Sequence, residues 1–280
     1  MRINPAIKKK VIVAAFCFLG LAGTAQGDTL ARIQESGVLK VGTEAAMPPL
    51  EFVQDGKIVG FGKDILDHIV AKNKLSLDQV NLPWQGILPG LTAKRFDLVA
   101  TAVTITPARA KNFAFTIPVA ESTTYVLKRA DNDSIKTMDD LNGKIGGTQI
   151  GSATEAVLRK WDKEQKEKGK PGLKEIKLYT TFPEVYLGVA NGELDIGVHS
   201  LTALTSLMKN RPGIYDLVGR ISDRSFYAWL TRPEDKTLRD FINKNFEEMI
   251  KDGKMEAIQK KWFSQPVDLP LTGYLPEGAQ

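Results

Sequence analysis

Two nine-residue stretches share one pattern, and this repetition constrains the fold more than any other feature of the sequence. FDLVATAVT occupies residues 96–104, and LDIGVHSLT occupies residues 194–202. In each stretch an aspartate precedes an apolar run with branched side chains, which predicts a buried strand that ends in polar residues. Because ligands of α/β proteins bind beyond the carboxyl ends of such strands, we expect both strands to end at a common cleft.

A helix start directly follows the first strand. Thr106 is a suitable N-cap, and Pro107 suits the first helical position because its missing N–H would have no partner there. Arg109 then falls in the first turn, near the Thr104 hydroxyl and the N–H groups at the strand end. A planar guanidinium matches a carboxylate bidentately. Arg109 is therefore a candidate carboxylate-binding residue, and the alternative is an ordinary surface arginine.

The segment FDLVATAVTITPARAKNFAFT resembles the signature of the amino-acid-binding family of periplasmic solute-binding proteins. In that family a strand ends in Thr or Ser, and an Arg follows after I-T-x-x. The resemblance extends from about Leu39 to Phe263. It implies that Arg109 clamps the α-carboxylate of the ligand and that Thr104 assists. It also implies an α/β fold of the periplasmic binding protein type II, in which two α/β lobes joined by two extended hinge segments close on the ligand.

The N-terminal residues 1–27 have the pattern of a secretory signal peptide. Four basic residues precede the apolar run Val11–Ala22, and small residues follow it. The run is too short to span a bilayer, and we expect cleavage after Gly27 or after Ala25. The only cysteine, Cys17, lies inside the run. The mature chain is thus expected to be periplasmic and stabilised by its core, without disulfides.

Removal of this segment also removes most of the net charge. The formal net charge is +5, and four of these charges precede Asp28 with no acidic residue among them, so +1 remains. A nucleic-acid partner therefore loses its electrostatic support. The densest charge run, Arg159–Lys170, mixes both signs and is typical of a solvated helix face.

Two extended segments, at residues 123–129 and 225–232, bracket a self-contained βαβ block. This order predicts a chain that leaves one lobe, builds a second and returns. We expect lobe 1 to comprise residues 28–123 and 228–280, and lobe 2 residues 124–227. Periodicity and capping signals predict helices over 28–35, 61–73, 85–94, 152–161, 181–191, 236–252 and 254–262, strands over 38–43, 144–147 and 194–198, and a hairpin over 52–58.

The loop after the first strand supplies further candidates. In the family an acidic residue and an aromatic residue of this loop contact the ligand, and Glu44 and Met47 match these positions. Methionine keeps an apolar contact but lacks a stacking face. Trp84, in the stretch PWQGILPGL, is the expected replacement, and the alternative is a buried structural tryptophan.

The turn before the predicted helix at 152–161 is a candidate anion site. Ser152 and Glu155 have the S-x-x-E spacing of a capping box, and the first N–H groups of a helix attract anions. Most helix N-termini bind only water. The resemblance nevertheless implies that this turn, including Ser152 and Ala153, receives the ligand carboxylate opposite Arg109.

The second of the repeated strands departs from the family pattern. Aligning the two stretches pairs His199 with Thr101 and Ser200 with Ala102. In the family the position of Ser200 is commonly an Asp that neutralises the α-ammonium of the ligand, and the glutamine-binding branch has His just before it. Because a buried ammonium needs a counter-charge, either the ligand lacks a standard α-amino group or Glu44 replaces the missing acid. We favour the first hypothesis.

We expect a monomer that captures an amino acid or related small carboxylate and delivers it to an inner-membrane ABC permease, with no cofactor and no metal. The alternative is a cyclohexadienyl-type dehydratase on the same scaffold, with His199 and Glu44 as acid or base candidates, although the sequence shows no nucleophile elbow. A sensor ectodomain would need a second membrane segment. No residue is predicted to be catalytic, and the predicted ligand-binding residues are Arg109, Thr104, Ala102, Thr101, Glu44, Met47, Trp84, Gln149, Ser152, Ala153, His199 and Ser200.

Overall fold

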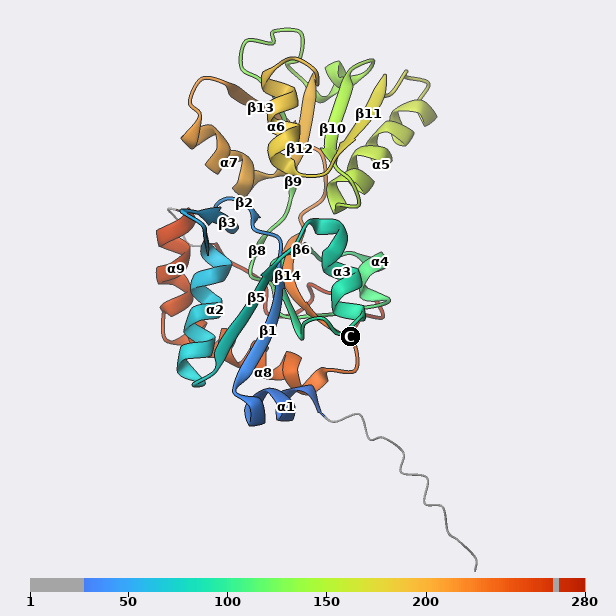
Figure 1. Cartoon of the computed structure of the whole chain (residues 1–280). Helices are drawn as coiled ribbons and strands as arrows, with labels where there is room; N and C mark the ends of the chain where they lie inside the picture. The colour runs from blue at the N-terminus through green and yellow to red at the C-terminus, as the bar shows by residue number, and fades with distance from the viewer. Residues whose placement is uncertain (1–27, 264–266, 280) are drawn as a thin grey trace, which may run out of the picture.

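Two α/β lobes, each built on its own sheet, make up the chain, and two extended segments connect them (Figure 1). The computed structural model describes residues 28–263 and 267–279. The predicted signal peptide, with Cys17, lies outside the described residues. Within those ranges, every helix is too short or too polar to cross a membrane.

Lobe 1, the lower lobe in Figure 1, contains the N-terminal and C-terminal elements. Its strands are β1 (Val38–Thr43), β5 (Ser76–Asn81), β6 (Leu98–Thr104), β7 (Ala114–Phe115), β8 (Ala120–Glu121) and β14 (Phe226–Thr231), with a small separate sheet of β2 (Ala46–Met47), β3 (Glu51–Gln54) and β4 (Lys57–Val59). Its helices are α1 (Thr29–Ser36), α2 (Phe61–Lys72), α3 (Trp84–Thr92), α4 (Pro107–Ala110), α8 (Lys236–Lys251) and α9 (Lys254–Phe263). The main sheet has the order β5-β1-β6-β14-β7, and β8 pairs with β14.

Lobe 2, the upper lobe in Figure 1, is formed by the middle of the chain. Its strands are β9 (Thr124–Arg129), β10 (Ile145–Gln149), β11 (Glu175–Tyr179), β12 (Ile196–Ser200) and β13 (Tyr215–Arg220), in the order β11-β10-β12-β9-β13. Its helices are α5 (Ala153–Glu167), α6 (Phe182–Ala190), α7 (Leu201–Asn210) and the short 3-10 helix η1 (Met138–Leu141).

The two repeated sequence stretches form β6 and β12, which occupy equivalent places in the two sheets. β6 is parallel to β1 and antiparallel to β14, and β12 is parallel to β10 and antiparallel to β9. In each lobe, therefore, the repeated strand lies between a parallel strand of its own lobe and an antiparallel strand that arrives from the other lobe. The predicted two-lobed α/β fold is confirmed.

The two segments that cross between the lobes are bonded to each other. Ser122 donates its backbone N–H to the carbonyl of Ser225 at 2.8 Å, and their hydroxyls are 2.9 Å apart. The backbone N–H of Thr124 donates to the Ser222 hydroxyl at 2.9 Å. The crossing segments thus behave as one paired ribbon next to the cleft, since neither can shift without straining these bonds.

Most predicted helices and strands are present within one or two residues of their expected ends. The helix predicted to run to Trp161 continues to Glu167 because its exposed face carries ion pairs spaced four residues apart, such as Lys166 with Asp162. The prediction missed α7 and the longer strands β5, β11 and β13, as well as the two-residue strands β2, β7 and β8 and the 3-10 helix η1. The three longer strands lie at sheet edges, where polar side chains are tolerated and the alternation of apolar residues is weak.

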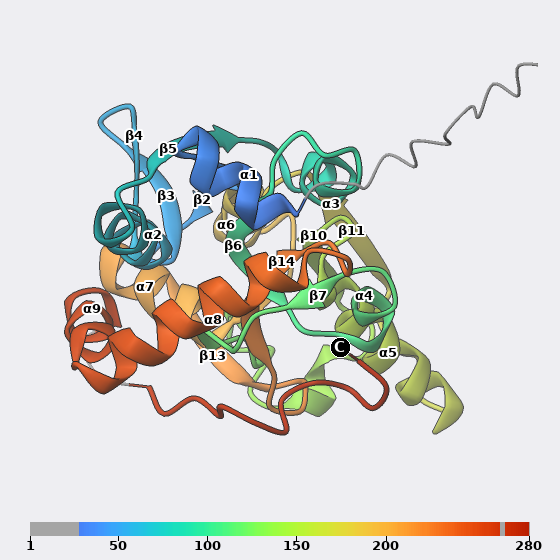
Figure 2. The same ribbon diagram turned by 90° about the horizontal axis from the view of Figure 1, so that it is seen from below.

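Seen from below in Figure 2, the C-terminal residues 267–279 run along one side of lobe 1 and end near α4. They contain neither helix nor strand. Tyr274 and Leu275 pack against the cluster of buried residues around Phe96 and Trp84. The tail therefore covers the side of lobe 1 that carries α3 and α4.

The Phe96 ring fixes α3 against the sheet of lobe 1. This ring lies against Gly42 of β1 and Gly90 of α3, and a Cβ atom at either glycine would overlap it. Both residues are therefore small because two backbones approach the same ring. The contact is important for the cleft, because β1 leads to Glu44 and α3 begins at Trp84.

We predict that Gly42→Ala lowers the free energy of unfolding by about 1 to 3 kcal/mol, because the added methyl group overpacks the Phe96 site. Urea denaturation of the mature chain measures this difference. The control is Gly86→Ala in α3, where a Cβ would meet only Leu82 at 3.7 Å. The control should be neutral or slightly stabilising, since alanine favours helix. A Gly42→Ala variant as stable as wild type would contradict the proposed packing constraint.

Candidate ligand-binding site

The carboxyl ends of β1, β6, β10 and β12 meet at a small pocket between the lobes, which we call the inner pocket. Residues from the starts of α3, α4, α5 and α6 complete its wall. Ten of the twelve residues predicted from the sequence line it, together with three that were not predicted. The lining residues are Glu44, Met47, Trp84, Ala102, Thr104, Arg109, Gln149, Ser152, Ala153, Thr154, Phe182, His199 and Tyr227.

Arg109 presents a positive charge that no acidic side chain balances in the described part of the chain. Thr106 caps α4 by accepting the Arg109 backbone N–H, and the guanidinium donates to the carbonyl of Thr104 at 2.9 Å. The guanidinium carbon lies 4.8 Å from the centre of the Trp84 ring, in a cation–π contact. Burial lowers the pKa of Arg109 to about 10, which still leaves it charged at neutral pH. The remaining N–H groups are available to an anion.

The N-terminus of α5 faces Arg109 from lobe 2. Ser152 accepts the backbone N–H of Glu155, as predicted, and also donates to the carbonyl of Gln149 at 2.7 Å. The Glu155 carboxylate accepts the N–H of Gly151 rather than that of Ser152, so the predicted capping box is displaced by one residue. The first turn of α5 thus keeps its partial positive charge at the inner pocket, where Ala153 also lies.

Glu44 joins the two lobes inside the pocket. Its carboxylate accepts a hydrogen bond from the Gln149 side chain of lobe 2 at 2.6 Å and another from the backbone N–H of Trp84. Glu44 is 4% exposed, and this burial raises its pKa to about 7. A second bond between the lobes runs from the Trp84 indole N–H to the carbonyl of Gly151 at 2.9 Å. Trp84 is therefore both a buried core residue and a wall of the pocket.

His199 is held in the wall of lobe 2 as a neutral ring. It is 1% exposed and stacks on Phe182, with ring centres 3.5 Å apart. Its Nδ1 is hydrogen-bonded to the Tyr186 hydroxyl, while its Nε2 has no partner among the described residues. Burial lowers the pKa of His199 to about 3, so the ring stays neutral at physiological pH.

Thr101 and Ser200 do not line the pocket. The Thr101 hydroxyl donates to the carbonyl of Glu44 at 3.2 Å and so supports the loop from behind. Ser200 accepts the N–H of Ala203 as the N-cap of α7. Successive residues of a strand face opposite sides. Ala102 of β6 and His199 of β12 do line the pocket. The sequence alignment did not pair these two residues, so the faces that the two repeated strands turn to the pocket differ by one residue.

Three lining residues, Tyr227, Phe182 and Thr154, were not among the predicted residues. Tyr227 lies on β14 directly opposite Thr104 of β6. Burial raises its pKa to about 12, while a hydrogen bond from Ser200 opposes this shift. Phe182 begins α6, and no local signal in the sequence marks it or Tyr227 as a ligand contact. Thr154 follows Ser152 and Ala153 in the first turn of α5, so the capping signal that marked this turn could have found it.

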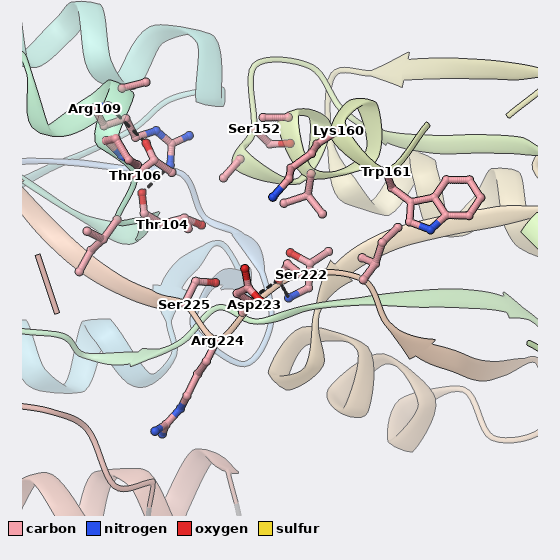
Figure 3. A pocket seen from close by; sticks show the side chains of 18 of the residues that line it. Thr104, Thr106, Arg109, Ser152, Lys160, Trp161, Ser222, Asp223, Arg224 and Ser225 are labelled. Carbon is pink, nitrogen blue, oxygen red and sulfur yellow. Dashed lines mark hydrogen bonds between the residues drawn. The ribbon is translucent and has the colours of Figure 1, made fainter. Parts of the chain in front are cut away.

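The inner pocket opens past Arg109 into a much larger outer pocket, shown in Figure 3. The inner pocket has a volume of about 20 Å³, and the outer pocket about 870 Å³. Thr104, Arg109, Ser152 and Ala153 line both. A space of about 20 Å³ admits little more than a water-sized group. An amino-acid-sized ligand therefore enters only if the contacts between the lobes separate.

The chemical groups of the inner pocket favour a site that binds a small anion. It combines one unbalanced guanidinium, one helix N-terminus, one buried carboxyl group and several neutral polar groups. Within residues 28–263 and 267–279, no group of three potential metal ligands comes together.

Comparisons with known proteins agree with this geometry. Residues 39–265 match the model of the bacterial extracellular solute-binding proteins, family 3. The L-cystine-binding protein TcyJ of Escherichia coli K12 is 28% identical, over 94% of this chain and 96% of that protein. The probable amino-acid-binding protein YxeM of Bacillus subtilis is also 28% identical, over 93% of this chain and 96% of that protein.

Solved structures show the same fold. An ancestral arginine-binding protein bound to arginine has a TM-score of 0.74 and 33% identity, covering 81% of this chain and 98% of its own. The P235GK mutant of ArgBP from T. maritima has a TM-score of 0.76 and 30% identity, covering 84% of this chain and 99% of its own. An ancestral amino acid-binding protein described as a precursor of cyclohexadienyl dehydratase has a TM-score of 0.72 and 26% identity, covering 84% of this chain and 99% of its own.

Two buried carboxyl groups predict an unusual dependence of stability on pH. Glu51, behind the pocket, accepts bonds from Thr101 and Ala102, and burial raises its pKa to about 8, as burial raises that of Glu44 to about 7. A raised pKa means that the folded state holds protons that the unfolded state releases. Stability from these groups is therefore complete below about pH 4.5 and declines as the pH rises toward 8.

We predict that Glu51→Gln reduces the loss of unfolding free energy between pH 5 and 8.5 by on the order of 3 kcal/mol, because the amide cannot ionise. Urea denaturation across this pH range measures the change. Glu248→Gln is the control, since the pKa of the exposed Glu248 is lowered by its bond to Lys72. Parallel pH curves for wild type and Glu51→Gln would contradict the expected ionisation of Glu51.

Proposed function

Because this chain belongs to the bacterial extracellular solute-binding proteins of family 3, we propose that it captures an amino acid or related small carboxylate between its lobes and delivers it to an inner-membrane ABC permease. The observation that carries the proposal is the unbalanced Arg109 guanidinium, which faces the N-terminus of α5 across a pocket between the lobes. A carboxylate placed there would receive charged hydrogen bonds from lobe 1 and backbone hydrogen bonds from lobe 2.

The surroundings of Arg109 support this role. Its bond to the Thr104 carbonyl and its stacking on Trp84 fix the plane of the guanidinium before the ligand arrives. Fewer rotamers then need to be frozen on binding, so more of the interaction energy appears as affinity. The apolar ring also excludes water from one face, which strengthens the charge interaction.

Ligand capture would be coupled to lobe movement. We propose that residues 28–123 and 228–280 move as lobe 1 and residues 124–227 as lobe 2, with the paired crossing segments as the hinge. The bonds from Gln149 to Glu44 and from Trp84 to Gly151 would break to admit the ligand and help to close the lobes again. A ligand that contacts both lobes favours the closed state by its differential affinity.

The relatives suggest which ligands to test. Their names refer to cystine, arginine and other amino acids. In this chain a cationic ligand group near Glu44 would lower the raised pKa of that carboxyl group and gain a buried ion pair. We further propose that the mature chain works as a periplasmic monomer after removal of residues 1–27, and that it is not an enzyme.

One observation keeps the cyclohexadienyl-type dehydratase as a second candidate. Glu44 has a pKa of about 7, which suits a general acid or base at neutral pH. His199 does not suit that role, since its pKa of about 3 keeps it neutral. Incubation of the mature chain with cyclohexadienyl acids distinguishes the candidates, because turnover that is lost in Glu44→Gln would favour the enzyme.

A thermal-shift screen of amino acids, keto acids and aromatic acids tests the proposed function. A ligand present at 100 times its dissociation constant adds about 2.7 kcal/mol to stability, which produces a clear rise in melting temperature. The screen also selects an acid for the two predictions that follow. A mature chain whose melting temperature responds to no carboxylate would argue against the proposal.

We predict that Arg109→Ala weakens binding of the selected acid by about 2 to 5 kcal/mol, because a desolvated charge pair is lost. Arg109→Lys should restore little, since an ammonium cannot form two parallel hydrogen bonds with a carboxylate. Isothermal titration calorimetry measures both variants. Lys160→Ala is the control, because Lys160 lines only the outer pocket. If Arg109→Ala bound like wild type, the carboxylate would have to lie elsewhere.

Lobe closure should be visible in solution scattering. We predict that the selected acid lowers the radius of gyration of the mature chain, because contacts from both lobes hold one small molecule. The same measurement on Arg109→Ala, at the same acid concentration, should show no change. A radius of gyration that stays constant at saturation in wild type would contradict the two-lobe clamp.

A further inference from the structure

The unpartnered Nε2 of His199 is the feature of the inner pocket that the proposed function leaves unexplained. The residue is 1% exposed, lines the pocket, and has no hydrogen bond at Nε2 within the described ranges. A buried polar atom without a partner costs free energy. Its presence in a binding pocket therefore indicates that a group of the ligand forms a hydrogen bond with it. What that group is depends on whether Nε2 carries the proton.

Tyr186 decides where the proton of His199 lies. Its hydroxyl is hydrogen-bonded to Nδ1, and this is the one hydrogen bond of that hydroxyl in the described part of the chain. If the hydroxyl donates, Nδ1 accepts and the proton of the neutral ring lies on Nε2. In the opposite arrangement the hydroxyl proton would be buried without an acceptor. The first arrangement gives a partner to Nδ1 and to the hydroxyl proton, and it leaves the Nε2–H donor open.

The position of Tyr186 is itself fixed. The backbone carbonyl of Tyr186 accepts a hydrogen bond from the Tyr215 hydroxyl at 2.9 Å. Phe182, one turn before Tyr186 in α6, stacks on the His199 ring. Burial raises the pKa of Tyr186 well above its usual value, so the hydroxyl keeps its proton. Tyr186 is therefore a positioning residue that holds the ring of the pocket-lining His199 and leaves its proton on Nε2.

We propose that His199 donates a hydrogen bond from Nε2 to the ligand, so that the ligand presents an oxygen acceptor there, as a 2-hydroxy or 2-oxo carboxylate does, instead of an ammonium. This inference rests on the proposed function, since it takes Arg109 as the carboxylate-binding residue. Both side chains line the inner pocket, so a molecule held there can contact both.

The other groups of the pocket support an oxygen acceptor over an ammonium. An ammonium has only donors, and opposite Nε2–H it would leave two donors facing each other. Ser200 supplies no charge, because its side chain is a neutral hydroxyl, and that hydroxyl caps α7. Glu44 is the one carboxyl group among the lining residues, and Gln149 and Trp84 already donate to it.

The first test determines the tautomer directly. The sequence contains two histidines, so His68→Gln assigns the remaining signals to His199. Long-range proton–nitrogen correlation spectra of the labelled mature chain should show a proton on Nε2 and none on Nδ1. Tyr186→Phe should give a mixture of tautomers, whereas Tyr179→Phe, which removes a hydroxyl that bonds to Glu193 in the same lobe, should not. A proton on Nδ1 in wild type would overturn the proposal.

The second test compares acids that differ in one group. The pairs are L-alanine with L-lactate, L-leucine with 2-hydroxyisocaproate, and L-arginine with argininic acid, measured by calorimetry. In the best-binding pair, wild type should prefer the hydroxy acid by about tenfold or more, as expected for a matched buried hydrogen bond. His199→Phe keeps the stacking on Phe182 but has no N–H, and it should abolish this preference.

The outcomes separate the two proposals. Equal or tighter binding of the amino acid by wild type, or an unchanged preference in His199→Phe, would overturn the role of His199 and leave the binding function intact. Arg109→Ala should weaken both members of a pair equally. If it weakened neither, or if no acid bound to wild type, the proposed function itself would fail, and this inference with it.

Discussion

The positive charge of Arg109, partly buried and without an acidic partner, is the constraint on which the site depends. A charge of this kind is tolerated because the Thr104 carbonyl and the face of Trp84 compensate part of its lost hydration. Local structure places it there, since β6 ends at Thr104 and Pro107 begins α4 immediately afterwards. The anion that this charge still requires is the reason for proposing this pocket as the ligand site.

The same pocket contains the contacts that hold the lobes together. Glu44 bonds to Gln149, and Trp84 bonds to Gly151, so two residues of the binding wall also carry the connection between the lobes. Entry of a ligand must disturb these contacts, and closure must re-form contacts of similar strength. In the proposed function, binding and lobe movement are coupled through these shared residues. The raised pKa of Glu44 reflects the cost of burying a carboxyl group at this junction.

The sequence predicted those features that local chemistry determines. The strand end, the cap at Thr106 and the position of Arg109 all follow from neighbouring residues. Features set by strand pairing could not be predicted in this way. Thr101 and Ser200 were expected in the site, but the phase of each strand turns them away from the pocket. Tyr227 reaches the site only because β14 returns from lobe 2 to pair with β6, and the polar edge strands were missed because they lack a buried alternating face.

The central claim is that one ligand carboxylate bridges Arg109 of lobe 1 and the N-terminus of α5 in lobe 2. A crystal structure of the mature chain with a bound acid tests it most directly. The account predicts that the carboxylate oxygens lie within hydrogen-bond distance of the Arg109 guanidinium and of backbone N–H groups at Ala153 or Thr154. A ligand that occupies the outer pocket alone, without touching Arg109, would contradict the account.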